Sequence, residues 1–495
     1  MSTIFYGALV SPVSLTSYDA LPRALLCVSH RTGDIQWIEQ DVPAGSLQDV
    51  LARHGIIDMS GMELVELRNG EFLIPGFIDT HTHAPQVPNI GSGQEHELLD
   101  WLAQTTFPME AKFADDNFAK KAYGTVVRRI IDSGTTTCCY YGTLHLGATK
   151  VLADFVHSAG QRAFVGKCNM DRNSPDYYIE SSAATSVEDT KSLISYIRGL
   201  TPNSTTALVQ PILTPRFAIS CTPELLGSLG DVARADPTLT IQTHICENDS
   251  EIQFTKNLFP PNILPPGSEA AKKGRTTYAG VYDAYGLLRK NTVLAHAVHL
   301  EDEEVEMIKK SNAGISHCPT SNFNLRSGCA RVGMLLDEGI KVGLGTDVSG
   351  GFSPSILTAV QHASIASKVV AMHHPSSQTS TTTFTSRQLP ISALLYLATQ
   401  GGADVCDLSK RTGSLEPGKA FDALVVSLKS DSGNPNVWGV DWDADLDVSG
   451  TNGKTERQSL EAQLERFLFT GDDRNIRRVY VQGRLIGGKE FIPSA

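Results

Sequence analysis

Short apolar runs alternate with helix-like patterns through the middle of the chain, from about residue 75 to residue 411. Each run is three to eight residues long and rich in apolar or β-branched side chains, which is typical of buried parallel strands. Such runs stand at 161–166, 206–213, 239–243, 292–295, 314–316 and 341–345, besides the one that ends at His83. Strand and helix in alternation predict β/α units, and their number favours an eight-stranded barrel over an open sheet.

The two ends of the chain have a different pattern. Short β-rich pieces separated by turn dipeptides stand at 24–29, 35–38 and 62–68, and the same texture returns at 422–428, 478–482 and 485–486. We therefore expect one small β-sandwich domain built from both termini, residues 1–74 and 412–495, beside a barrel over 75–411. The predicted fold class is α/β.

Composition narrows the class of protein further. The chain has 495 residues, 41% hydrophobic and 19% charged, which is ordinary for a globular enzyme. Its net charge of -12 and the lack of clustered basic residues predict no nucleic-acid partner. No run approaches the length that spans a bilayer, and the nine cysteines show no Cys-x-x-Cys spacing. We expect no membrane partner and a cytoplasmic location.

Two segments differ from the β/α pattern. Residues 259–275 are rich in Pro, Gly and Lys, which predicts a surface insertion. Residues 376–386 are nearly all Ser and Thr, and they form either a rim segment that closes over a ligand or an irregular connection.

Histidines and one aspartate follow the predicted strands and carry the candidate chemistry. His81 and His83 lie one residue apart on a strand, so their side chains share a face. His244 and Asp347 each end a later apolar run, and the carboxyl ends of barrel strands meet at one rim. Any one of these residues alone is more often packed or solvated. Together, His81, His83, His244 and Asp347 predict a site for one divalent ion, either zinc or ferrous iron.

Three residues are candidates for acid–base work beside that ion. Asp347 lies where it can accept a proton from a bound water, and Glu247, three residues after His244, is the predicted proton shuttle. His296 ends another strand and is predicted to hydrogen-bond the attacking water or to stabilise charge on the adduct. His299 and His317 are interpreted as structural.

Several motifs resemble those of the amidohydrolase superfamily and, within it, the guanine deaminase family, over nearly the whole chain. Pro-Gly-Phe-Ile-Asp-Thr-His-Thr-His at 75–83 and Gly-Thr-Asp at 345–347 mark the superfamily. His-Ala-Pro-Gln at 83–86 together with Thr-Pro-Arg-Phe at 214–217 is much more specific to guanine deaminases. Further matching pieces are Thr-Thr-Phe-Pro at 105–108, Gly-Thr-Thr-Thr-Cys at 134–138, His-Cys-Pro at 317–319, and stretches at 413–419 and 471–476.

The resemblance implies zinc-dependent hydrolysis of guanine to xanthine and ammonia, in purine catabolism or salvage, by a homodimer. It implies that guanine contacts His83, Ala84, Pro85, Gln86, Arg216, Phe217 and His244. The chemistry agrees, since a Gln amide complements the donor and acceptor of guanine's amide-like edge, Arg216 offers donors, and Phe217 can cover a purine face. Trp101 either lines the same pocket or belongs to the core.

Other classes of protein stay open as alternatives. A binuclear barrel hydrolase needs a carboxylated lysine on the strand before the third histidine, and residues 209–215 contain none; Lys167 lies on an earlier strand and is interpreted as structural. Zinc deaminases with His-x-Glu and Pro-Cys-x-x-Cys motifs do not match. Deamination of cytosine, a pterin or a triazine, or a barrel that only binds, remain as competing interpretations.

Overall fold

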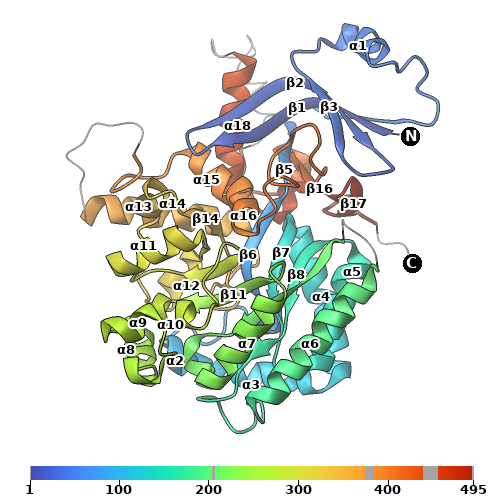
Figure 1. Cartoon of the computed structure of the whole chain (residues 1–495). Helices are drawn as coiled ribbons and strands as arrows, with labels where there is room; N and C mark the ends of the chain where they lie inside the picture. The colour runs from blue at the N-terminus through green and yellow to red at the C-terminus, as the bar shows by residue number, and fades with distance from the viewer. Residues whose placement is uncertain (1, 203–206, 374–382, 439–454, 493–495) are drawn as a thin grey trace.

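The computed structural model describes residues 2–202, 207–373, 383–438 and 455–492. It contains two sheets: a parallel barrel surrounded by helices, and a second sheet made from both ends of the chain, which lies above the barrel in Figure 1. The predicted α/β fold class is confirmed.

The barrel strands run parallel and pair in chain order. They are β6 (Phe77–His83), β7 (Thr135–Tyr141), β8 (Arg162–Gly166), β10 (Val209–Pro215), β11 (Thr240–Ile245), β12 (Thr292–His296), β13 (Gly314–His317) and β14 (Lys341–Leu344), with the short β9 (Cys168–Asn169) beside β10. The ring is drawn together between its first and last strands, because Thr80 Oγ1 donates to Leu344 O at 2.8 Å and Asp347 N donates to His81 O at 2.8 Å.

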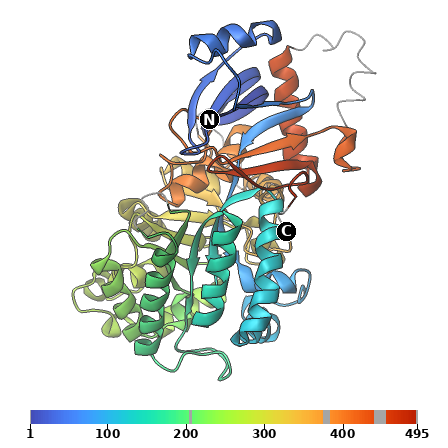
Figure 2. The ribbon, with the colours of Figure 1, turned by 90° about the vertical axis from the view of Figure 1, so that its right-hand side faces the viewer.

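Helices cover the outside of the barrel (Figure 2). They include α4 (Asp116–Asp132), α5 (Leu146–Ala159), α6 (Ala183–Leu200), α7 (Pro223–Ala235), α8 (Asp249–Leu258), α10 (Tyr278–Ala284), α11 (Asp302–Ser311), α12 (Pro319–Asn324), α13 (Val332–Asp337), α14 (Ile356–His373), α15 (Ile391–Ala398) and α16 (Gln400–Val405). Helix α7 illustrates why they begin where they do: Thr222 caps it by accepting from Leu225 N, and Pro223 fills the first turn. Its leucines Leu225, Leu226 and Leu229 are buried against the barrel.

The second sheet joins the two ends of the chain. Its strands are β1 (Ser2–Ser14), β2 (Ser17–Ser29), β3 (Ile35–Glu39), β4 (Glu63–Glu66), β5 (Glu71–Pro75), β15 (Ala423–Ser427), β16 (Ile476–Val481) and β17 (Arg484–Gly487). Strand β15 pairs antiparallel with β5, with Val425 opposite Leu73. Helix α18 (Glu456–Thr470), which the β-rich texture did not predict, buries Leu464 and Phe467 in the core.

A buried ion pair connects this sheet to the barrel. Arg162, at the start of β8, donates to Asp422, just before β15, through Nε at 2.8 Å and Nη2 at 3.2 Å. Both side chains are almost fully buried. The amide of Gly76, which precedes β6, donates to the carbonyl of Asp422 at 2.9 Å. Asp422 therefore fixes the base of the barrel to the terminal sheet.

The two segments that departed from the β/α pattern, 259–275 and the described part of 376–386, contain none of the barrel strands. The predicted surface insertion contains the short helix α9 (Glu269–Lys273) and is anchored by Phe259, which is fully buried. Residues 376–382 of the Ser/Thr-rich segment lie outside the described residues. Phe384 and Thr385 donate their backbone N–H groups to Asp337 at 2.8 and 2.7 Å. Within the described ranges, no helix is both long and apolar enough to cross a bilayer.

Candidate active site

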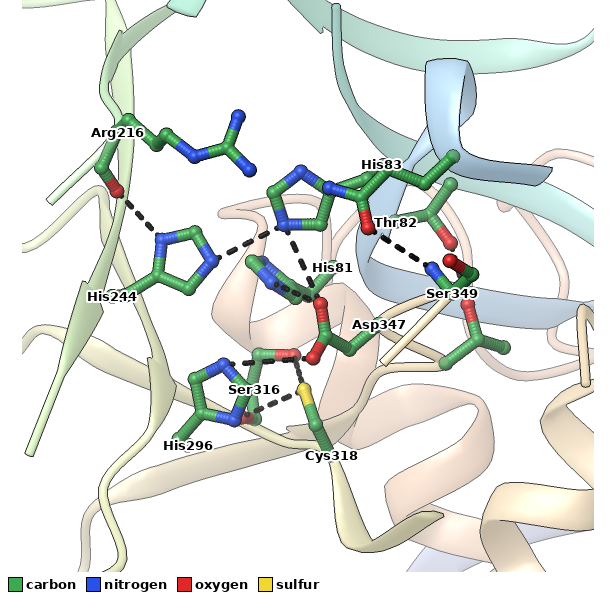
Figure 3. A network of polar contacts seen from close by, with 12 residues as sticks. His81, Thr82, His83, Arg216, His244, His296, Ser316, Cys318, Asp347 and Ser349 are labelled. Carbon is green, nitrogen blue, oxygen red and sulfur yellow. Dashed lines mark hydrogen bonds and ion pairs between the residues drawn. The ribbon is translucent and has the colours of Figure 1, made fainter. Parts of the chain in front are cut away.

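The predicted rim residues come together at the carboxyl end of the barrel (Figure 3). His81 and His83 lie on β6, His244 on β11 and His296 at the end of β12, while Asp347 follows β14. His81 Nε2 lies 3.0 Å from Asp347 Oδ1, and His83 Nε2 lies 3.4 Å from the same oxygen. His83 Nε2 is also 3.1 Å from His244 Nε2. Side chains that are up to 266 positions apart thus share one small volume.

His296 takes a more central place than predicted. One donor atom from each of His81, His244, His296 and Asp347 lies within 4.8 Å of the others. His83 is outside this tightest group, although it touches His244 and Asp347. The backbone helps to aim these side chains, because His296 and Asp347 have positive φ angles of 75° and 45°. Left-handed backbone at residues other than glycine is costly and gathers at functional sites.

The charge states of the cluster suit metal binding. Burial lowers the pKa of His81 and lowers those of His83 and His244 strongly, so that these rings are neutral at physiological pH. Burial alone would raise the pKa of Asp347, but the surrounding imidazoles, His81 foremost, hold it below its usual range. The cluster thus offers neutral nitrogens and one carboxylate, the ligands that zinc prefers.

Unpartnered ring nitrogens give a direct test of whether a metal ion fits. His81 Nε2 and His296 Nε2 both lie beside the Asp347 carboxylate and are buried, yet neither makes a hydrogen bond to any described residue. Buried polar atoms are normally satisfied, so two such nitrogens facing one carboxylate point to a missing ligand. His244 Nδ1 donates to the carbonyl of Arg216 at 2.6 Å, which leaves Nε2 free to bind a metal. The residues present fit a divalent ion.

Glu247 occupies the position expected of a proton shuttle. Its Oε2 lies 3.4 Å from His296 Nε2, and its Oε1 accepts from Ser327 Oγ at 3.2 Å. Burial, and then the negative charge of Asp347, raise the pKa of Glu247 well above its usual value. A raised pKa lets a carboxyl group keep its proton to a higher pH than usual and give it up within the site.

A cavity adjoins the cluster and encloses about 380 Å³ of empty space, its open mouth included. It is lined by His83, Gln86, Leu98, Trp101, Leu102, Arg216, Phe217, His244, Glu247, Glu251, Leu325 and Asp347. Trp101 lines the cavity and is also buried in an apolar cluster with Leu98 and Leu102, so both of its interpretations remain open. Ala84 and Pro85, also expected to contact the substrate, are buried in η2 (Ala84–Asn89) and are not among the lining residues.

Several residues of the site were not identified from the sequence. Glu110 and Glu251 are fully buried beside it, and Asp79 beneath His81 accepts from Thr82 Oγ1 at 2.7 Å and from Thr346 N at 3.0 Å. Asp79 could have been identified from the sequence, since it stands two residues before His81 in the same motif. Glu110 and Glu251 carried none, because an isolated glutamate in a helix usually faces solvent.

The residues interpreted as structural lie away from the cavity. His299 Nε2 donates to the carbonyl of Ser327 at 2.7 Å. Lys167 forms a buried ion pair with Glu180 and donates to Cys168 O at 3.0 Å. Strand β10, which precedes the His244 strand, contains no lysine, in agreement with a site for a single ion. His317 is buried, and burial lowers its pKa to about 3.

A parallel β/α barrel with imidazoles and a carboxylate gathered at its carboxyl rim defines the class of metal-dependent barrel hydrolases. The comparisons with known proteins place the chain within this class. The model of the Amidohydrolase family matches residues 72–486, and the chain belongs to this family. It is an enzyme that hydrolyses C–N bonds.

Individual relatives resemble the chain over almost its full length. A probable guanine deaminase of Schizosaccharomyces pombe is 42% identical over 99% of this chain and 84% of the relative. The guanine deaminase of Homo sapiens is 36% identical over 100% of this chain and 97% of the relative. The crystal structure of the guanine deaminase from C. acetobutylicum with bound guanine superposes with a TM-score of 0.79 at 33% identity, covering 98% and 100% of the two chains.

Proposed function

We propose that this enzyme is a guanine deaminase, which uses water to hydrolyse guanine to xanthine and ammonia. One observation carries the proposal: Gln86 and Arg216, both buried, line the same cavity as Glu247 and Asp347. Polar groups that can read a purine edge therefore stand beside groups that can perform hydrolysis. The relatives named above are guanine deaminases, which supports the same substrate.

We propose that His81, His83, His244 and Asp347 hold one zinc ion, with iron(II) as the less favoured metal. His296 lies within reach of the same ion, and metal analysis of variants will show whether it binds directly. A divalent metal at this position supplies a Lewis acid that makes water a nucleophile at neutral pH. Zinc is favoured over iron because the neutral imidazoles and single carboxylate form a typical zinc donor set.

The remaining steps belong to the chain's own side chains. Gln86 and Arg216 hold the polar edge of guanine, while Phe217 and Trp101 bound the cavity with apolar surface and exclude water. Asp347 accepts a proton from the attacking water, and Glu247 delivers a proton to a ring nitrogen as the C–O bond forms. His296 stabilises the charge on the tetrahedral adduct. Asp347 then passes the proton that it accepted to the amino group, the C–N bond breaks to release ammonia, and the hydroxyl of the adduct returns a proton to Glu247 as the carbonyl group of xanthine forms.

Other features of the protein are part of the same proposal. We propose a homodimer, because the family resemblance implies one, and a cytoplasmic location, because the nine cysteines are all free thiols. We also propose the division into a terminal domain, residues 1–74 and 412–495, and a barrel over 75–411. It is supported by the separation of the two sheets after Pro75 and before Ala423.

The proposal is tested by incubating the purified, metal-loaded protein with guanine and following xanthine by its absorbance and ammonia by a coupled assay. We expect both products in equal amounts. The same assay with cytosine, a pterin and an aminotriazine separates the alternatives. If guanine is inert while another aminoheterocycle releases ammonia, the substrate is wrong and the hydrolytic metal site stands.

A further inference from the structure

We propose that Glu110 is a positioning residue that sets the specificity for guanine by fixing the orientation of Gln86 and Arg216. This inference rests on the proposed function. Glu110 ends the short helix α3 (Phe107–Glu110) and is completely buried. It does not line the cavity, so it acts through the two side chains that do.

Glu110 accepts hydrogen bonds from three side chains that lie far apart along the chain. Gln86 Nε2 donates to its Oε1 at 2.8 Å. Arg216 Nη1 donates to its Oε2 at 2.7 Å, and the hydroxyl of Tyr178 donates to the same oxygen at 2.6 Å. A carboxylate with all these donors in a buried place is held rigidly, and charge-assisted bonds of this kind are about twice as strong as neutral ones.

The contact with Glu110 decides which way the Gln86 amide faces. A carboxylate only accepts, so the NH₂ group of Gln86 must point to Glu110. At the other end, Gln86 Oε1 accepts from the backbone N–H of Ser349 at 3.2 Å. A flipped amide would place oxygen against the carboxylate and NH₂ against an N–H donor. The second N–H and the second lone pair of Gln86 are therefore presented to the cavity in one fixed order.

Arg216 is held in the same way. The ion pair with Glu110 occupies Nη1, and the guanidinium stands over the ring of Phe107 with 5.4 Å from Cζ to the ring centroid. Both partners of the ion pair are almost fully buried. In Figure 3 the Arg216 side chain points towards the His83 ring, and both residues line the cavity. The planar fork can then present its remaining donors in one direction only.

Polar groups that are fixed in a buried site discriminate between substrates, because a substrate that lacks the matching groups leaves them without hydrogen-bond partners. Guanine carries an N1–H donor and an O6 acceptor, and 2-aminopurine, with the same amino group at C2, has neither. A buried site built to pair such groups rejects an analogue that lacks them, because its own donors and acceptors are left without partners. If Glu110 did not hold them, Gln86 could turn and Arg216 could swing, and the penalty against 2-aminopurine would shrink.

The test compares kcat/KM for guanine and 2-aminopurine in the holoenzyme and in Glu110→Gln. The preference for guanine is kcat/KM for guanine divided by kcat/KM for 2-aminopurine. It does not depend on the fraction of active protein, so a variant that only folds less well would keep the same preference. We expect the preference for guanine to fall by at least about tenfold, mainly through a higher KM for guanine. Where 2-aminopurine turns over too slowly, its inhibition constant replaces its KM. Tyr178→Phe, which keeps Glu110 but removes one of its donors, should lower the preference in the same direction by about threefold.

Glu180→Gln is the matched control. Glu180 also forms a buried ion pair, with Lys167, but it touches neither Gln86 nor Arg216, so the preference should stay at the wild-type value. An unchanged preference in both Glu110→Gln and Tyr178→Phe would overturn the role of Glu110 while leaving the proposed function intact. A wild-type enzyme that does not act on guanine would instead overturn the proposed function, and this inference with it.

Discussion

Glu247→Gln separates the proton-transfer role of Glu247 from its role as part of the cavity wall. Glutamine has the same shape, so its amide oxygen can still accept from Ser327 Oγ, as Oε1 does at 3.2 Å. The hydrogen bond from the Glu247 backbone N–H to Glu251 Oε2, at 2.7 Å, does not involve the replaced group. The variant therefore loses the titratable carboxyl and little else.

The size of the effect follows from that single loss. General acid–base catalysis by one positioned side chain contributes about 10²- to 10⁴-fold. At about 1.36 kcal/mol for each factor of ten, the barrier should rise by roughly 3 to 5 kcal/mol. A residue that only shapes the cavity would change turnover by a few-fold at most. Because the predicted metal ligands are untouched, the metal content of the variant should equal that of the wild type.

The assay is xanthine formation per mole of bound metal, with the metal measured by plasma mass spectrometry. Glu304→Gln is a matched control: Glu304 is also buried, but it accepts from backbone groups such as Ala279 N at 2.9 Å. That control should lower the melting temperature and keep turnover per metal. A Glu247→Gln enzyme with full metal content and turnover within threefold of the wild type would refute the proton-shuttle role.

Three further predictions concern the metal and pH. His83→Ala should lose bound metal and activity together, as measured by mass spectrometry and turnover; full occupancy in this variant would contradict its assignment as a ligand. Removal of the metal by a chelator should abolish deamination and lower the melting temperature, and zinc should restore both, since free metal at 100 times its Kd stabilises by about 2.7 kcal/mol; activity that survives complete removal would exclude a catalytic metal. Burial, and then the charge of Glu247, raise the pKa of Glu251 from 4.5 to about 7. Between these two values the folded state binds a proton that the unfolded state has released, so stability should fall as pH rises from 4.5 to 7, by about 3 kcal/mol at most. Urea unfolding at several pH values checks this, and Glu251→Gln should remove that part of the slope; an identical slope in the variant would argue against the raised pKa.

Individual strands of the barrel could be predicted from the sequence where they are apolar and end in a candidate site residue. The runs before His244 and His296 met both conditions. Strand β7 was not assigned from its sequence, because it begins with Thr135, Thr136 and Thr137, which are polar yet completely buried. Strand β1 was not predicted, and β2 is longer than the predicted piece at 24–29, because the turn that joins them, Ser14-Leu15-Thr16-Ser17, has no Asn-Gly or Asp-Gly signal.

The rim cluster was predictable for a related reason, and its supporting groups were not. Barrel topology brings strand ends together whatever their sequence separation, so His81 and Asp347 could be grouped from their positions alone. Glu110 depends instead on contacts made 24 and 106 positions along the chain, to Gln86 and Arg216. Such contacts follow from the packing of α3 against the rim, and neither periodicity nor local composition records that packing.

The ion pair between Arg162 and Asp422 has a consequence for how this chain is made. The two residues are 260 positions apart, so a nascent polypeptide that has already produced most of the barrel still lacks the anion that neutralises Arg162. An uncompensated charge at a position destined for burial opposes closure of the barrel base, since breaking a buried pair costs about 3 to 5 kcal/mol. Completion of the barrel should therefore wait until Asp422 and the adjoining β15 have been synthesised. A chain truncated before Asp422 should be prone to aggregation and degradation.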